Sequence, residues 1–222
     1  MKIELHCHTN RYSPCGQMAP DLLISAYAAA GYDAVYLTDH DAVWPHDELE
    51  ELRQRNPRLL VFPGLEKSLG RYGPQHLLIL GANDPEYLAM DAEEQVLAKA
   101  RAEGHLTMLA HPYRYTGSDG MLRRGVLPDA IEHRSLNHDE QMGAAAELTA
   151  RTLGLPLVNA GDAHAVFQVG WFWIETSRPV VRAGDIRGIV LAGEYANRCA
   201  DAEPEGPAAP ASGGEDRCGL GA

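Results

Sequence analysis

The sequence predicts an α/β fold in which strands and helices alternate and the strands close into a barrel. Short apolar runs of strand length recur along the chain, and segments of helical length separate them. The number of these runs fits a β/α barrel better than an open sheet of four or five strands. Candidate metal ligands border the same runs, as expected where the carboxyl ends of parallel strands meet at one mouth.

The individual elements follow from residue periodicity and from start and stop signals. In the first strand, Ile3, Leu5 and Cys7 alternate with His6 and His8, so the apolar side chains are expected on one face and both imidazoles on the other. The other strands are predicted at 34–38, 59–65, 77–80, 106–110, 130–134, 156–160 and 170–174. Helix start and stop signals predict helices at 20–30, 46–54, 96–103, 139–153 and 185–193.

The composition predicts one domain followed by a tail. A chain of 222 residues with 45% hydrophobic residues can bury a single full core. From Cys199 onward the sequence changes to Ala, Pro, Gly and Glu with almost no large apolar residues. We therefore expect one folded domain at 1–198 and a disordered tail at 199–222.

Charge and segment composition limit the partners and the compartment. The formal net charge of −12 argues against a long nucleic-acid duplex as partner. The chain contains neither a long uncharged apolar stretch nor a basic leader with an apolar core, which predicts a cytoplasmic protein without a membrane partner. The four cysteines have no Cys-x-x-Cys spacing, so disulfides are not expected.

Side chains that commonly bind metal ions recur beside the predicted strands. Each one alone is weak evidence, but their repetition in one register predicts a multinuclear hydrolase site. These candidate ligands are His6, His8, His40, Glu66, His76, His111, Asp162 and His164. His76 precedes its apolar run and is expected to enter the site from the loop after Glu66. Nitrogen and carboxylate ligands favour zinc, manganese or iron over calcium or magnesium.

The same motifs, taken in order, resemble the PHP domain, named for polymerase and histidinol phosphatase. They are Glu4-Leu5-His6-Cys7-His8-Thr9, Thr38-Asp39-His40-Asp41, Pro63-Gly64-Leu65-Glu66, His76-Leu77-Leu78-Ile79-Leu80-Gly81, Ala110-His111-Pro112 and Gly161-Asp162-Ala163-His164. The resemblance spans almost the whole chain before the tail. It implies a distorted seven-stranded, TIM-like β/α barrel and a metal-dependent phosphoesterase.

The resemblance also implies how the ligands are shared between metal ions. The first ion would be held by His6, His8, Glu66 and Asp162. Glu66 would bridge to a second ion that His76 and His111 also hold, and His40 and His164 would belong to a third.

The third site departs from the family pattern. The family usually supplies an acidic residue or a histidine shortly after the His-x-His pair, and here that region reads Tyr12-Ser13-Pro14-Cys15-Gly16. Either Cys15 replaces the missing ligand as a thiolate, which would favour zinc, or the third site is weak or empty. Two or three divalent ions, zinc or manganese, are therefore expected.

Four further side chains are candidates for supporting roles. Asp39 either orients an imidazole ligand or caps a turn. Arg114 and Arg11 either bind a substrate phosphate or are solvated surface groups. Glu132 resembles the family's Ile-Glu strand and is expected to line the barrel.

The preferred function is hydrolysis of a small phosphate ester, with a metal-bridging hydroxide as nucleophile. The substrate would be a phosphorylated metabolite, a nucleotide or a short oligonucleotide. The chain contains neither a Gly-x-Ser-x-Gly nucleophile motif nor a phosphate-binding Gly-x-x-x-x-Gly-Lys-Ser/Thr motif, which is consistent with a metal-activated nucleophile. Two alternatives remain open: hydrolysis of an amide-type bond and a metal-stabilised module without catalysis.

Overall fold

A curved sheet surrounded by helices forms the protein. The computed structural model describes residues 1–69 and 73–200. The strands are β1 (Lys2–Glu4), β2 (Ala34–Leu37), β3 (Leu60–Leu69), β4 (Gln75–Leu80), β5 (Leu106–Leu109), β6 (Ala130–Glu132), β7 (Leu157–Val158), β8 (Phe172–Thr176) and β9 (Tyr195–Cys199). The α-helices are α1 (Pro20–Ala29), α2 (His46–Arg55), α3 (Glu93–Glu103), α4 (Gly120–Arg123), α5 (Glu140–Leu153) and α6 (Asp185–Leu191), and short 3-10 helices are η1 (Pro85–Ala89) and η2 (Val166–Gln168).

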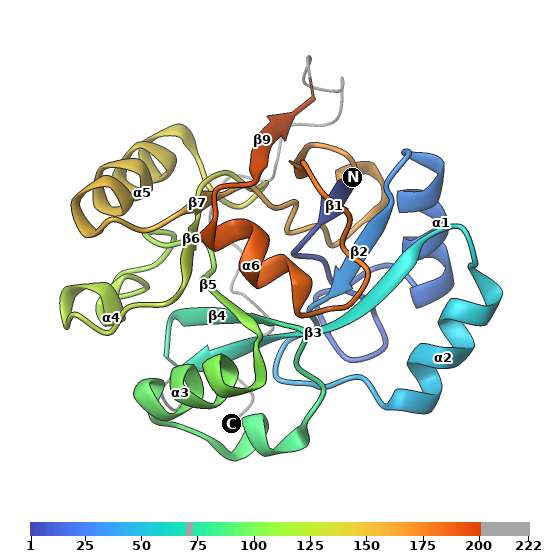
Figure 1. The fold of residues 1–222 in the computed structure, drawn as a ribbon, viewed down its shortest axis with the longest axis horizontal. Helices are drawn as coiled ribbons and strands as arrows, with labels where there is room; N and C mark the ends of the chain where they lie inside the picture. Colours follow the sequence, from blue (N-terminus) through green and yellow to red (C-terminus); the bar gives the residue numbers. More distant parts are fainter. Residues whose placement is uncertain (70–72, 201–222) are drawn as a thin grey trace.

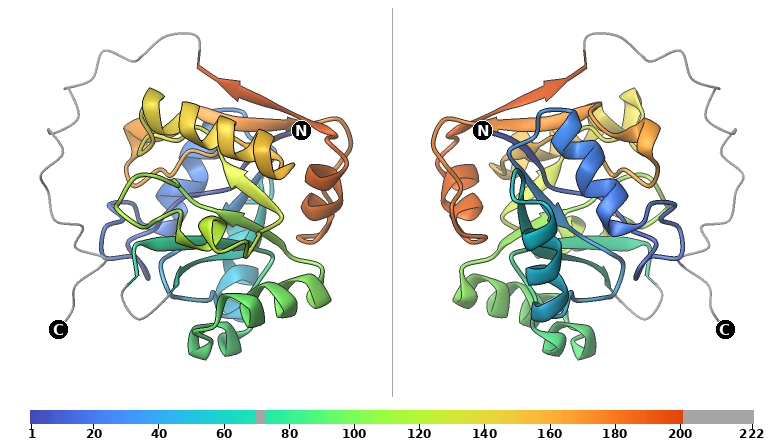
Figure 2. Two further views of the ribbon diagram at one scale, coloured as in Figure 1. Left: turned by 90° about the vertical axis from the view of Figure 1, so that its left-hand side faces the viewer. Right: turned by 90° about the vertical axis from the view of Figure 1, so that its right-hand side faces the viewer.

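In the described part of the chain, the strands form one sheet in the order β7-β6-β5-β4-β3-β2-β1-β8-β9. The sheet curls into a nearly closed barrel, with α1 and α2 on one side and α4 and α5 on the other (Figure 1). Strands β1 to β7 follow one another around the sheet, in the number that the family resemblance implied. Strand β8, which the sequence also predicted at 170–174, and β9, which it did not predict, extend the sheet beyond β1 (Figure 2). The predicted distorted α/β barrel is therefore confirmed.

Strand β4 runs opposite to its neighbours, which the sequence did not predict. It pairs antiparallel with both β3 and β5, whereas β1, β2 and β3 are parallel to one another, as are β5, β6 and β7. Residues 70–74, which connect the two strands in the sequence, are too few for the crossover that a parallel strand needs, so β4 pairs antiparallel with β3. As a result, the amino end of β4, and not its carboxyl end, lies at the mouth of the barrel.

The barrel closes between the first and last barrel strands. Cys7, just after β1, forms a parallel bridge with Ala163, which follows β7, and His8 N–H donates to the Ala163 carbonyl at 2.9 Å. Farther from the mouth, the side chains of Tyr195 and Asn197 on β9 donate to the Leu157 carbonyl at 2.7 and 2.9 Å. These contacts join β7 to the opposite edge of the sheet.

The alternation predicted for the first strand is interrupted after Leu5. Ile3 and Leu5 belong to the core cluster that includes α6, whereas Cys7 packs with the buried side chains of α1 and α2. Leu5 N–H and His6 N–H both donate to Glu4 Oε1 at 3.0 Å, so a buried carboxylate replaces the regular strand pairing here. The predicted common face for Ile3, Leu5 and Cys7 is therefore wrong, although His6 and His8 do share one site.

The first two residues of the predicted tail, 199 and 200, are among the described residues. Cys199 is the last residue of β9 and pairs with Phe172 of β8. The remainder of the predicted tail, from residue 201, lies outside the described residues. Within the described residues, no helix has both the length and the apolar character that crossing a membrane requires.

Candidate metal centre

The eight predicted ligands lie together at one end of the barrel. His6 and His8 follow β1, His40 follows β2, and His111 follows β5. Glu66 lies in β3 and His76 is the second residue of β4, while Asp162 and His164 follow β7. His76 therefore enters from a strand and not from the predicted loop, because the reversed β4 brings its amino end to the mouth. All of these side chains are buried or largely buried.

Four of these side chains converge on one point. His6 Nε2 lies 3.1 Å from His8 Nε2, 3.1 Å from Glu66 Oε2 and 3.3 Å from Asp162 Oδ1. His8 Nε2 lies 3.1 Å from Glu66 Oε2 and 3.3 Å from Asp162 Oδ1. These are the four residues that the family resemblance assigned to the first metal ion.

This cluster has the dimensions and the chemistry of a divalent cation site. Ligand atoms around a four- or five-coordinate zinc ion are roughly 3–3.5 Å apart, given ligand distances near 2 Å. The tautomer of His6 supports the same conclusion, because Glu132 Oε1 lies 2.9 Å from His6 Nδ1 and a carboxylate requires the proton there. In the neutral ring, the Nε2 lone pair then points into the cluster. Asp162 Oδ1 is buried there and accepts no hydrogen bond from the described residues.

A second group of ligands surrounds the other oxygen of Glu66. His76 Nδ1 lies 2.9 Å and His111 Nε2 lies 3.0 Å from Glu66 Oε1. His40 Nδ1 approaches Glu66 Oε2 at 3.2 Å, so Glu66 contacts imidazoles through both of its oxygens. A carboxylate in this position can bridge two cations, as the resemblance implied.

A third group contains the cysteine that the sequence singled out. Cys15 lies with His8, His40 and His164 so that their potential ligand atoms are all within 4.8 Å of one another. The His8 ring stacks with His40 at a centroid distance of 4.5 Å and with His164 at 4.4 Å. The structure thus places a thiol where the family pattern has an acidic residue or a histidine.

Charge within the centre is balanced by these contacts. Burial alone would raise the pKa of Glu66, but His40, His6 and His76 outweigh it and hold the pKa well below its usual range. Burial works to lower the pKa of His8, but Asp162 and Glu66 outweigh it and raise the pKa to about 9. His164 behaves differently, since burial and then His8 lower its pKa to about 4. A neutral His164 keeps a lone pair for a cation.

Two buried carboxylates outside the ligand set hold the ligands in place. Glu132 accepts the His6 ring N–H through one oxygen and the His111 backbone N–H, at 2.6 Å, through the other. Glu4 Oε1 accepts the backbone N–H groups of His6 and Gly161, the latter at 2.7 Å. Burial raises the pKa of Glu4 to about 7, against the opposing effect of these N–H donors.

The sequence underestimated these supporting residues. Glu132 ends β6 at the mouth, so the strand-end rule that located the ligands also points to it, and the structure adds its contact with His6. Asn137, whose side-chain amide donates to Asp162 Oδ2, lies in a loop without any periodic signal. Ser13 contacts His8 Nδ1 at 3.2 Å and accepts the His40 backbone N–H at 2.8 Å. Serine is too common in loops to have been selected from sequence.

Asp39 does not orient an imidazole. Its carboxylate accepts Thr9 N–H and Thr9 Oγ1–H, both at 2.7 Å, and Trp44 Nε1–H at 3.0 Å. The imidazole-orienting role that the sequence suggested is thus replaced by fixing the loop that follows His8. The cause is the backbone, which brings Thr9 to Asp39 as β1 and β2 leave the sheet side by side.

The two candidate arginines have different surroundings. Arg114 Nη1 lies 3.9 Å from Asp162 Oδ2, and its side chain is 25% exposed, so it lies beside the centre with access to solvent. Arg11 instead pairs with Glu48 on α2 at 2.9 Å, and its side chain is 53% exposed. The suggested phosphate contact from Arg11 is therefore not supported, because Glu48 holds its guanidinium.

Two ligands have strained backbone conformations. His111 has φ of 26° and Asp162 has φ of 50°, in the left-handed region that side chains other than glycine rarely adopt. Such conformations cost about 1–3 kcal/mol and persist where surrounding contacts impose them. Here the contacts are the N–H bonds to Glu132 and Glu4 at or next to the strained residues.

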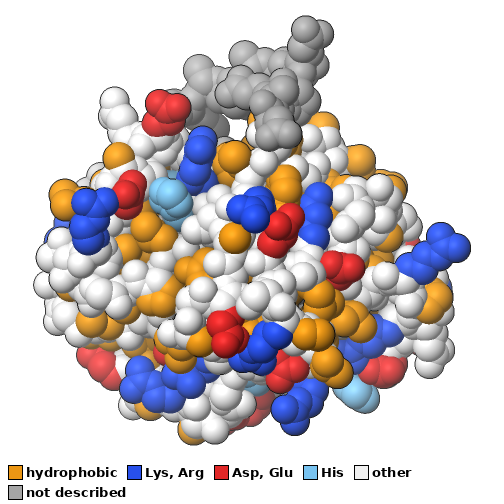
Figure 3. Space-filling model, turned by 45° about the horizontal axis from the view of Figure 1, so that its top comes forward, with side chains coloured by type: hydrophobic (Ala, Val, Ile, Leu, Met, Phe, Trp, Pro, Cys, Tyr) orange, Lys and Arg blue, Asp and Glu red, His pale blue; other side chains and the backbone are white. Residues whose placement is uncertain are grey.

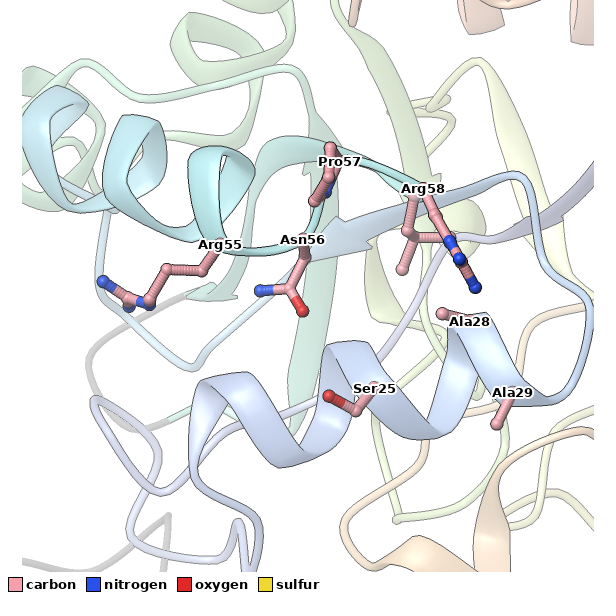
Figure 4. Close-up of a pocket in the computed structure, with 8 residues that line it drawn as sticks. Ser25, Ala28, Ala29, Arg55, Asn56, Pro57 and Arg58 are labelled. Carbon is pink, nitrogen blue, oxygen red and sulfur yellow. The ribbon is translucent and has the colours of Figure 1, made fainter.

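A separate surface hollow lies between α1 and the turn from α2 to β3 (Figure 4). It has a volume of about 450 Å³ and is lined by Ser25, Ala28, Ala29, Arg55, Asn56, Pro57, Arg58 and Leu59. None of the predicted ligands lines it, and Arg55 is already paired with Asp21 at 3.0 Å. The hollow therefore has no part in the centre described above.

The fold resembles several solved structures. The chain superposes with a TM-score of 0.65 on a two-domain protein of Bacteroides vulgatus that contains a predicted PHP-like metal-dependent phosphoesterase, with 16% identity over 90% of this chain and 64% of that one. A protein of Bifidobacterium adolescentis proposed to be a metal-dependent phosphoesterase superposes with a TM-score of 0.61. The identity is 15%, over 84% of this chain and 94% of that one. An amidohydrolase of Chromobacterium violaceum, with bound sulfate and no metal, superposes with a TM-score of 0.59. The identity is 18%, over 74% of this chain and 88% of that one.

The comparisons define the fold of the chain. The chain has the barrel of the PHP-like metal-dependent phosphoesterases, which confirms the resemblance at the level of fold. It spans about 64% of the length of the Bacteroides protein. By sequence, no protein-family model and no curated protein matches it. Together with this barrel, the histidine and carboxylate clusters fit a protein that binds divalent cations.

Proposed function

We propose that this protein is a metal-dependent phosphoesterase that hydrolyses a small phosphate ester. The observation that carries the proposal is the convergence of two imidazoles and two carboxylates, with separations of 3.1–3.3 Å, at the mouth of the barrel. When bound, divalent cations at such a centre lower the pKa of water and neutralise charge on the phosphoryl oxygens.

Six of the candidate ligands have a defined task in this proposal. His6, His8, Glu66 and Asp162 would hold one cation, and Glu66 would share a second with His76 and His111. Zinc or manganese suits this mixture of nitrogen and oxygen ligands. Glu132 keeps the proton of His6 on Nδ1, so that Nε2 faces the cations.

Arg114 supports a phosphate ester as the substrate. Its guanidinium lies beside Asp162 with a quarter of the side chain exposed, and such a group can donate two parallel hydrogen bonds to a phosphate. The net charge is −12, and acidic and basic side chains are interspersed on the face shown in Figure 3. The negative net charge and the mixed surface charge favour a compact substrate over a long duplex. Such a substrate would be a phosphorylated metabolite, a nucleotide or a short oligonucleotide.

Hydrolysis of an amide-type bond is the second candidate. A structural neighbour of similar fold is described as an amidohydrolase, and paired cations also activate water against carbonyl groups. Arg114 is the feature that separates the two candidates, because a neutral amide offers its guanidinium no charged partner.

Across a panel of substrates, the test measures inorganic phosphate released from phosphate monoesters, including nucleoside 3',5'-bisphosphates, and the alcohol released from phosphate diesters. The protein is loaded with manganese or zinc, and a chelated sample is the control. We expect metal-dependent release from at least one small ester. Absence of release across the panel from protein that retains its metal ions would contradict the proposal, and amide hydrolysis by the same sample would favour the second candidate.

Two substitutions locate the activity. Glu66→Gln removes the carboxylate shared between the two ligand groups and should abolish release, while circular dichroism shows a retained fold. Glu48→Gln is the matched control, because it removes a carboxylate that pairs with Arg11 outside the centre. Equal turnover in Glu66→Gln and the parent protein would show that this centre does not perform the reaction.

A further inference from the structure

The loop after the His-x-His pair is built to bring Cys15 to the centre. Gln17 N–H donates to the His164 carbonyl at 2.8 Å, which ties this loop to the segment that follows β7. Gly16 N–H donates to the Ser13 carbonyl at 3.0 Å, and a Cβ at Gly16 would collide with the Thr9 carbonyl. The tight turn at Gly16 thus fixes Cys15 beside His164, although the two are far apart in the sequence.

The contacts of the three histidines near Cys15 show which ring nitrogens remain available. His8 uses both nitrogens, since Nδ1 contacts Ser13 at 3.2 Å and Nε2 faces Glu66 at 3.1 Å. His164 Nδ1 donates to the Asp162 carbonyl at 3.0 Å, which leaves Nε2 with a lone pair. His40 Nδ1 faces Glu66 at 3.2 Å, which leaves its Nε2.

We infer that Cys15 serves as a thiolate ligand beside His40 and His164, and that this third site therefore selects borderline-soft divalent ions, zinc or cobalt, over manganese or magnesium. The potential ligand atoms of these residues lie within 4.8 Å of one another. A thiolate favours zinc-like ions, whereas carboxylates also accept harder ions such as manganese. The inference rests on the proposed function, because it specifies the cation of one part of the same centre.

This third site also differs from the first cluster in its access to solvent. The side chains of His40 and His164 are 10% and 18% exposed, and Cys15 is half-buried. In contrast, His6, His8 and Glu66 are completely buried. Three protein ligands with solvent access leave a position for water or substrate, as in catalytic zinc sites. The third ion should therefore exchange faster than an ion in the first cluster.

Cobalt titration of the metal-free, full-length protein tests the inference. Cobalt bound to a thiolate gives a near-ultraviolet charge-transfer band, which imidazole and carboxylate ligands do not give. We expect this band in the parent protein and expect Cys15→Ser to lose it together with one bound equivalent of cobalt. Cys199→Ser is the matched control, because Cys199 is exposed on β9, and it should keep the band.

A second variant distinguishes loss of the thiolate ligand from misfolding of Cys15→Ser. Cys15→Asp replaces the thiolate by a hard oxygen ligand, so it should lose the cobalt band and bind one more equivalent of manganese than the parent protein. A parent protein without the band at full cobalt loading would overturn the inference, as would a band that persists in Cys15→Ser. Phosphate release by manganese-loaded protein is measured separately, so failure of the proposed function leaves the cobalt result interpretable.

Discussion

Replacing Glu132 with glutamine should separate cation binding from folding. One carboxylate oxygen accepts the His6 Nδ1 proton at 2.9 Å and the other accepts the His111 backbone N–H at 2.6 Å. A glutamine side chain has one acceptor and one donor group. Since the backbone N–H of His111 can only donate, the amide oxygen should face His111 and the amide NH2 should face His6.

The glutamine therefore favours the wrong tautomer of His6. With an NH2 group opposite Nδ1, the His6 proton moves to Nε2, the atom that lies 3.1 Å from Glu66 in the ligand cluster. To bind a cation, His6 must return the proton to Nδ1 and lose a charge-assisted hydrogen bond of about 1.5–3 kcal/mol. This energy corresponds to roughly a 10- to 150-fold loss of affinity, taking about 1.4 kcal/mol for each factor of ten.

The assay is a competition for zinc or manganese between the protein and a chelator of known affinity, followed by thermal unfolding of the metal-free protein. The control is Asp129→Asn, another buried carboxylate beside β6, which pairs with Arg187 at 3.0 Å away from the ligands. It should change stability without changing affinity for the metal ion. If Glu132→Gln retains the ion as tightly as the parent protein, the tautomer argument is refuted.

Three further predictions follow from the same contacts. Arg114→Ala should raise KM for a phosphate ester by about tenfold, with Arg114→Lys intermediate, as steady-state kinetics will show. Gly161→Ala places a Cβ 2.5 Å from Glu4 Oε2 and should lower the free energy of unfolding by about 1–3 kcal/mol in denaturant titration, whereas Gly143→Ala, with no contact closer than 3.5 Å, should not destabilise the protein. Because the pKa of His8 is raised to about 9, the metal-free protein carries a proton there at neutral pH that a cation must displace. Affinity should therefore rise with pH toward 9, with proton release detected calorimetrically in buffers of different ionisation enthalpy. An affinity independent of pH in this range would contradict the last prediction.

The convergence of the candidate ligands could be predicted from sequence because these residues obey a strand-end rule. His40, His111 and Asp162 each follow a buried parallel strand, so the fold brings them together whatever the loops do. His76 obeys the same rule only after β4 is reversed, and the reversal depends on the short connection after β3. The direction of a strand depends on which strands it pairs with. An apolar run has the same residue pattern in either direction, so the sequence alone does not reveal that β4 is reversed.

The supporting contacts could not be predicted in the same way. Whether Arg11 binds substrate or Glu48 depends on where α2 packs against the first loop. Asp39 was placed correctly beside a ligand, but its partners are Thr9 and Trp44, which come from different parts of the chain. A long or polar side chain can choose among several partners, and the choice is made by tertiary packing.

The two buried carboxylates outside the ligand set explain how the centre keeps its shape before a cation arrives. Glu4 and Glu132 both contact His6, one through its backbone and the other through its ring. Glu4 also binds Gly161, next to the strained Asp162, and Glu132 binds the strained His111. Ligands that follow β1, β5 and β7 are thereby fixed to one another by hydrogen bonds that do not involve a cation. These hydrogen bonds hold the candidate ligands in place in advance, so the binding of a cation requires little reorganisation of the side chains. Loss of the Glu4 or Glu132 carboxylate should therefore weaken cation binding even with every ligand intact.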